Sequence, residues 1–262
     1  TGSTNGVLFQ DTTTNKKYYV KYPGKARAQV ELLASQLYGL ASVPSATAEL
    51  IEHAGDKHAI ASHWIDDVKS MDALDMRHNN HVLNNFAIDA WLANWDVVGM
   101  EADNIVMGPA GVAYRIDPGG ALTFRAQGGV KEFLGTKVDE LRTFLDGNIN
   151  PSSAEVFAGL KQEHKEAGAK KLAQIDNKQI AQIVDATDMT AEEKTFFKDR
   201  LAGRRYIIVK EILGEDFQVK GECKPGFHHH GVVAGHSDKA FEDCHPETRK
   251  HRIKREKVSG RS

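Results

Sequence analysis

Cysteine is scarce in this chain, since Cys223 and Cys244 are the only two among 262 residues. Two cysteines cannot build a disulfide framework, although they leave room for one bridge or a metal site, so the sequence favours a reducing compartment. Long apolar runs are also absent, and none approaches the roughly 20 residues that a membrane-spanning helix needs. We therefore expect a soluble protein without a membrane span, in the cytoplasm or delivered into a cytosol.

The start of the chain lacks a charged segment followed by an apolar one, so the sequence predicts no leader. The chain opens with Thr1 and Gly2. We expect that it begins inside a larger protein.

No charge of one sign dominates the composition, because 34 lysines and arginines face 36 aspartates and glutamates. This balance argues against a protein whose main task is to bind nucleic acid through a uniformly basic surface. Basic residues gather only at 246–262, where seven of them stand against two glutamates. That segment would suit a nonspecific contact with an anionic partner, nucleic acid or acidic lipid, or would simply be solvated.

Hydrophobic residues make up 40% of the chain, which is enough to bury one core or two adjoining lobes. Residues 1–67 predict a small β-rich lobe. Its pattern consists of strand-like runs at 7–10 and 17–22, a helical period at 26–40, and further strand-like runs at 47–51 and 58–65. The expected order is β-β-α-β-β.

Residues 68–213 predict a helical lobe. We expect one helix at 81–94, a hairpin of two short strands at 104–116, and helices through most of 130–213. In the last of these ranges, Ser152-x-x-Glu155 and Thr190-x-x-Glu193 have the spacing of capping boxes. The fold class predicted for the chain is therefore α+β, with a β-rich lobe followed by a helical one.

Residues 214–262 show no sustained period and are rich in His, Lys, Gly and Arg, so we expect a weakly ordered tail. Cys223, His228-His229-His230, His236 and Cys244-His245 offer the ligand types that zinc prefers. Their spacing is not that of a recognisable zinc module, and a histidine-rich tail without metal is the alternative interpretation.

Two features of the small lobe could bind phosphate. Gly2, Ser3 and Gly6 precede the first hairpin, and a glycine-rich loop lets backbone N–H groups approach a phosphate. Lys21 ends the second strand and Glu31 follows on the next helix, so a helix carboxylate could orient a strand lysine toward phosphate oxygens. Each feature alone is also compatible with a frayed terminus or a solvated ion pair.

A stronger signal lies around the hairpin of the helical lobe. Asp96 follows the end of a predicted helix, Asn104 opens a strand, and Asp117 ends the paired strand before Pro118-Gly119-Gly120. Phosphoryl transfer needs such a set, because one carboxylate positions the acceptor hydroxyl and takes its proton, while an amide oxygen and a second carboxylate hold magnesium on a triphosphate. The alternative interpretation is that Asp96 and Asp117 are only helix-end and turn residues.

The order of these motifs resembles the protein-kinase-like fold, and within it the atypical HipA-like and phosphoinositide-kinase-like branch. The resemblance rests on Tyr19-Val20-Lys21, on Gln29-Val30-Glu31, on Asn94-Trp95-Asp96, on Asp103-Asn104-Ile105 and on Arg115-Ile116-Asp117-Pro118-Gly119-Gly120, and it covers residues 1 to about 213. Two departures are visible. Asn104 stands eight residues after Asp96, a wider spacing than is usual in kinases, and Pro118 occupies the place of the common phenylalanine.

The resemblance implies ATP and Mg²⁺ as cofactors and a role for each matching residue. Lys21 would contact the ATP phosphates and pair with Glu31, and Gly2, Ser3 and Gly6 would line the phosphates. Asp96 would be the catalytic carboxylate, with Asn104 and Asp117 as magnesium ligands. The backbone of His63, Trp64 and Ile65 would form the hinge that meets adenine.

The expected activity is ATP-dependent transfer of a phosphoryl group to a serine or threonine hydroxyl of a protein substrate whose identity the sequence leaves open. Two alternatives stay open at this point. The same lobes could hold ATP in another orientation and transfer AMP, or the wider spacing from Asp96 to Asn104 could mark a pseudokinase scaffold without turnover.

Overall fold

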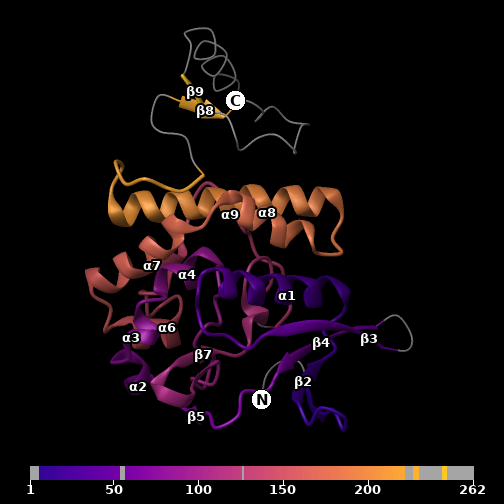
Figure 1. Cartoon of the computed structure of the whole chain (residues 1–262). Coiled ribbons are helices and arrows are strands. Elements are labelled where there is room, and N and C mark those ends of the chain that lie inside the picture. The colour runs from indigo at the N-terminus through magenta and orange to yellow at the C-terminus, as the bar shows by residue number, and fades with distance from the viewer. Residues whose placement is uncertain (1–5, 54–56, 126, 222–226, 230–243, 247–262) are drawn as a thin grey trace.

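A four-stranded antiparallel sheet with one helix packed on it forms the smaller lobe of the computed structural model (Figure 1). The structure describes residues 6–53, 57–125, 127–221, 227–229 and 244–246. In chain order this lobe contains β1 (Val7–Gln10), β2 (Lys17–Lys21), α1 (Lys25–Leu40), β3 (Ala48–His53) and β4 (Lys57–His63), and the strands lie in the order β1-β2-β4-β3. The predicted β-β-α-β-β order is confirmed.

Local chemistry explains the hairpin of β1 and β2 and the helix that follows. The carboxylate of Asp11 accepts hydrogen bonds from the backbone N–H groups of Thr13 and Thr14, an Asx-type turn. α1 then buries one apolar face, with Leu33 and Leu37 fully buried, and it packs on β3 and β4. The sheet and α1 together set the end of β2, where Lys21 lies.

A small three-stranded sheet connects the two lobes. It consists of β5 (Lys69–Ser70), β6 (Ile105–Met107) and β7 (Ala113–Arg115), of which the sequence predicts the hairpin but not β5. The backbone N–H of Ala46 donates to the carbonyl of Arg115, and the N–H of Arg115 donates to the carbonyl of Pro44, each over 3.0 Å. These bonds hold the end of β7 beside the chain that leaves α1.

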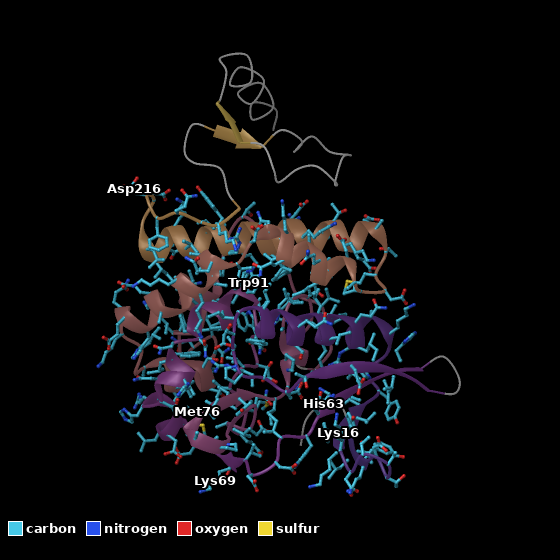
Figure 2. The ribbon with its side chains drawn as sticks, viewed as in Figure 1. Lys16, His63, Lys69, Met76, Trp91 and Asp216 are labelled. Atoms are coloured by element: carbon cyan, nitrogen blue, oxygen red, sulfur yellow. The ribbon has the colours of Figure 1, made fainter. Side chains whose placement is uncertain are left out.

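The larger lobe is helical. Its helices are α2 (Ala73–Arg77), α3 (Asn80–Leu83), α4 (Phe86–Trp91), α5 (Glu140–Thr143), α6 (Pro151–Phe157), α7 (Gln162–Gln174), α8 (Asn177–Asp185) and α9 (Ala191–Leu213). The long helix α9 lies on the side of the helical lobe away from the four-stranded sheet, with Trp91 beneath it in the core (Figures 1 and 2). The indole N–H of Trp91 donates to the carbonyl of Leu201 on α9 over 2.9 Å, which orders the centre of this lobe.

The helix expected at 81–94 is broken into α3 and α4. The side chain of Asn85 donates to the carbonyl of His81 over 2.8 Å, and the guanidinium of Arg115 donates to the carbonyls of His81 and Val82. Side chains therefore satisfy backbone groups that a continuous helix would pair internally, and the helix ends there at little cost.

Of the two predicted capping boxes, one is confirmed and one is wrong. At Thr190 the box is present, since its hydroxyl accepts from the N–H of Glu193 and the Glu193 carboxylate accepts from the N–H of Thr190. The box predicted at Ser152 is wrong. Pro151 occupies the first turn of α6, and Asn150 caps it by accepting from the N–H of Ser153.

The first residues of the predicted tail belong to the helical lobe instead. Val219 is 1% exposed, the N–H of Lys220 donates to the carbonyl of Ala173, and the carbonyl of Lys220 accepts from Arg205. Farther on, β8 (Phe227–His229) pairs antiparallel with β9 (Cys244–Pro246).

The other predictions for the tail lie outside the described residues. They are the weak order of 222–226, 230–243 and 247–262, the zinc-ligand candidates Cys223, His230 and His236, and the basic contact segment. The remaining zinc-ligand candidates stand on the two strands, His228 and His229 on β8 and Cys244 and His245 on β9. Among the described residues, no group of three or more His, Cys, Asp or Glu side chains could hold a metal ion. A search of the same residues finds no helix with the length and apolar character required to cross a membrane.

Candidate active site

Lys21 is the centre of an ion cluster in which Lys21 and Glu31 are buried and Asp117 is partly exposed. Its Nζ lies 2.5 Å from Oε1 of Glu31 and 2.9 Å from Oδ1 of Asp117. Burial disfavours the charged ammonium, but the carboxylates of Glu31 and Asp117 outweigh it and raise the pKa of Lys21. Lys21 thus stays protonated near neutral pH, and the predicted pair of Lys21 and Glu31 is present in the structure.

Asp117 reaches this cluster because of the turn that follows it. Its side chain caps the short 3₁₀ helix η2 (Pro118–Gly120), where Oδ1 accepts from the N–H of Gly119 over 3.1 Å. A Cβ on Gly119 would lie 3.0 Å from Oδ1 of Asp117 and 3.1 Å from Oε2 of Glu31. The absence of a side chain at Gly119 therefore lets the turn fit between these two carboxylates.

Asp96 lies on the turn after α4, beside the same glycines. The amide Nδ2 of Asn104 donates to the backbone carbonyl of Asp96 over 2.6 Å and to its Oδ2 over 3.2 Å. Burial raises the pKa of Asp96, the Asn104 hydrogen bond opposes this, and the negative charges of Asp117 and Asp103 add to it. The carboxylate is therefore a better proton acceptor than a solvated aspartate.

Asp96 and Asn104 are eight residues apart in the sequence but adjacent in space. Gly99 adopts φ 80°, a left-handed conformation that reverses the chain, and the N–H of Asn104 donates to the carbonyl of Val98 over 3.2 Å. The two side chains are consequently in direct contact. The longer loop does not separate them.

Two side-chain oxygens of Asn104 and Asp117 are of the type that binds magnesium. The hydrogen bonds of Asn104 described above use its Nδ2, and those of Asp117 use its Oδ1, so Oδ1 of Asn104 and Oδ2 of Asp117 are the oxygens that could meet a hard cation. Magnesium commonly takes one or two protein oxygens and completes its shell with substrate phosphates and water. The donor set therefore fits Mg²⁺ bound together with a nucleotide.

Among the other predicted site residues, Gly2 and Ser3 lie outside the described residues. Gly6 packs against the ring of Tyr19, where a Cβ would lie 2.2 Å from the ring carbon Cζ. This contact gives Gly6 a packing role at the start of β1. Its predicted contact with phosphate stays a prediction.

The predicted hinge follows β4. His63 ends the strand and pairs with Glu49 at 3.7 Å, and the backbone N–H of Trp64 donates to the carbonyl of Lys17 over 2.9 Å. The N–H of Trp64 is thus used within the sheet, and Ile65 is half-buried. The adenine contact of this segment stays a prediction.

The sequence reasoning missed Lys131. Its Nζ donates to the backbone carbonyls of Ala93 and Gly120, 2.5 Å from each. Lys131 stands in no recognisable motif, and nothing in its neighbours Val130 and Glu132 marks it. Only the fold brings it to the turns that carry Asp96 and Asp117.

No protein-family model matches the chain, and no curated protein matches it in sequence. Among solved structures the chain is similar to the proinflammatory kinase CtkA of Helicobacter pylori, with a TM-score of 0.52 and 18% identity, over 80% of this chain and 91% of that chain. This likeness shows a two-lobed, protein-kinase-like fold and confirms the fold class predicted from the sequence.

Two further solved structures match less well. The 618-residue N-terminal fragment of LepB from Legionella pneumophila gives a TM-score of 0.37 and 14% identity, over 76% of this chain and 46% of that chain. The choline kinase LicA of Streptococcus pneumoniae gives 0.31 and 12%, over 81% of this chain and 83% of that chain.

The packing of Gly120 against Asp96 yields a prediction that does not depend on activity. A Cβ at Gly120 would lie 2.7 Å from Cβ of Asp96, so one of the two turns must shift in Gly120→Ala. We expect a loss of about 1–3 kcal/mol in the free energy of unfolding, measured by urea denaturation. Gly39→Ala in α1 is the control, because nothing lies within 4 Å of its Cβ, and this variant should keep or raise the stability. Equal stability of Gly120→Ala and the unmodified protein would contradict the close contact.

Proposed function

We propose that this chain is an ATP-dependent phosphotransferase that uses Mg²⁺ and modifies a serine or threonine hydroxyl of a protein substrate. The observation that supports it most is that two bonded pairs, Lys21 with Asp117 and Asn104 with Asp96, lie near enough for the charge of Asp117 to act on Asp96. The kinase-like fold shared with CtkA supports the same reaction class.

Lys21 is suited to bind and orient phosphate oxygens. It stays charged, and Glu31 and Asp117 fix the position of its Nζ from two sides. A lysine held in this way gives a fixed positive charge without the entropy loss of ordering a free side chain during binding. Glu31 acts by holding Lys21, since its side chain is only 5% exposed.

Asp96 is suited to accept the proton of the attacking hydroxyl. Burial raises its pKa, which favours proton transfer, and the amide of Asn104 holds one carboxylate oxygen. Mg²⁺ would neutralise charge on the phosphates when it is bound with ATP, and Oδ1 of Asn104 and Oδ2 of Asp117 are the atoms that would hold it.

The finer parts of the proposal rest on the sequence motifs. These are the place of the chain in the HipA-like and phosphoinositide-kinase-like branch, the phosphate contacts of Gly2, Ser3 and Gly6, and the adenine contacts of the segment 63–65. The serine or threonine acceptor belongs with them. The pseudokinase alternative loses its main support, because the wide spacing of Asp96 and Asn104 is closed by a direct hydrogen bond.

Mass analysis of the products tests the reaction. Purified protein incubated with MgATP and candidate acceptor proteins should yield a product with one added phosphoryl group. Asp96→Asn and Asp117→Asn should each lower the transfer rate by about 100-fold or more, because the first removes the proton acceptor and the second a cation ligand. Asp185→Asn, at an exposed ion pair on α8, is the control and should keep the rate. An AMP adduct, or undiminished transfer by Asp96→Asn, would contradict the proposal.

The acid limb of the rate profile gives a second test. Transfer needs the deprotonated carboxylate of Asp96, so kcat/KM should rise with pH through a midpoint above 3.8, the ordinary value, because burial raises this pKa. The negative charge of Asp103 adds to the shift, and Asp103→Asn should therefore move the limb to lower pH. Protonation of ATP itself affects the pH profiles of the unmodified protein and of Asp103→Asn equally, so it does not contribute to the difference between them. A limb that moves to higher pH in Asp103→Asn would show that Asp96 is not the group observed.

A further inference from the structure

Lys131 spans the two turns that carry the acidic side chains of the site. One hydrogen bond of its Nζ reaches the carbonyl of Ala93, three residues before Asp96, and the other reaches the carbonyl of Gly120, three residues after Asp117. A single amine therefore joins the segment of the proton acceptor to the segment of the cation ligand.

The two turns have few other bonds between them. The N–H of Leu122 donates to the carbonyl of Leu92 over 2.7 Å, and Gly120 packs on Cβ of Asp96. Both Ala93 (φ 48°) and Leu122 (φ 56°) adopt the left-handed conformation, which costs energy for residues with a side chain. A backbone held in such a conformation needs support from its surroundings, and Lys131 lies where it can give that support.

A lysine is a costly choice for this place if its only role is to fill space. Burial lowers the pKa of Lys131 to about 7, with Glu140 and Asp96 opposing the change and Arg204 and Arg125 adding to it. An apolar side chain of the same length would avoid the loss of solvation. What it would lack is two hydrogen-bond donors aimed at two carbonyls.

We propose that Lys131 is the positioning residue that holds the Asp96 turn and the Asp117 turn at the separation that phosphoryl transfer requires. The proposal rests on the proposed function for its kinetic consequence, but not for its structural one. It also makes the site dependent on the segment that ends at Lys131, whose N–H donates to the carbonyl of Thr123 over 2.9 Å.

Steady-state kinetics give the first part of the test. In Lys131→Met, kcat should fall about 10- to 100-fold, as for a misplacement of reacting groups by up to 1 Å, while KM for ATP stays within about twofold because Lys21 is untouched. Lys131→Arg retains two donors and should recover much of kcat. Lys137→Met is the matched control, an exposed lysine in the same connection that pairs with Asp139, and it should behave as the unmodified protein.

Hydrogen exchange of the chain without substrate gives the second part and needs no activity. The amides of Val97, Ala121 and Leu122 should exchange at least about tenfold faster in Lys131→Met, with recovery in Lys131→Arg and no change in Lys137→Met. Amides of α7 and α9 report whether the rest of the lobe stays folded. Should Lys131→Met fail to fold, Lys131→Gln, whose uncharged amide nitrogen lies one bond closer to the backbone than Nζ of lysine, takes its place in both measurements.

The two parts separate the possible failures. If the unmodified chain transfers no phosphate but local exchange rises in Lys131→Met, the proposed function is wrong and the positioning role stands. If transfer occurs and Lys131→Met keeps both the kcat and the exchange of the unmodified protein, the positioning role is wrong and the function stands. Equal exchange acceleration throughout α7 and α9 would mean that Lys131 supports the whole lobe and would also overturn the positioning role.

Discussion

The structure of the site depends on one ion cluster, in which the ammonium of Lys21 lies between the buried carboxylate of Glu31 and the partly exposed carboxylate of Asp117. Removing such charges from water is unfavourable unless their geometry is good, so β2, α1 and the glycine turn must meet closely for the fold to form. Asp96 lies near this cluster, where the charge of Asp117 raises its pKa and the charge of Lys131 lowers it. These carboxylates and the amide oxygen of Asn104 are the donors that the proposed function assigns to Mg²⁺ and to a nucleotide that would complete its shell.

A second, buried hydrogen-bond network lies next to the ion cluster of Lys21 in the sequence and supports it. Arg115 binds both carboxylate oxygens of Asp89 on α4, and the hydroxyl of Tyr38 on α1 donates to Asp89 and accepts from Asn94. Arg115 stands two residues before Asp117, and Asn94 two residues before Asp96. The network therefore fixes the two chain segments from which the acidic side chains emerge. The alignment of the site is thus built into the core and not only into its loops.

The sequence predicts the fold well where a local period decides the structure, and poorly where side chains take over backbone hydrogen bonds. The strands and the helix around Lys21 and Glu31 follow from periodicity and turn chemistry, and Asp96, Asn104 and Asp117 stand out because each ends or begins an element. The break between α3 and α4 could not be foreseen, because it depends on Arg115, more than 30 residues away. Lys131 could not be foreseen either, since its two partners are backbone carbonyls, which leave no trace in the sequence.

The proposed function requires Asn104 and Asp117 to hold one divalent ion, bound with a nucleotide next to Lys21, with Asp96 beside it. Anomalous diffraction from crystals grown with Mn²⁺ and a nonhydrolysable ATP analogue tests it most directly, because Mn²⁺ accepts the same hard oxygen ligands as Mg²⁺. We expect an anomalous peak about 2.1 Å from Oδ1 of Asn104 and from a carboxylate oxygen of Asp117, with the phosphates beside Nζ of Lys21. A nucleotide bound without metal at these atoms, or with its phosphates away from Lys21, would contradict it.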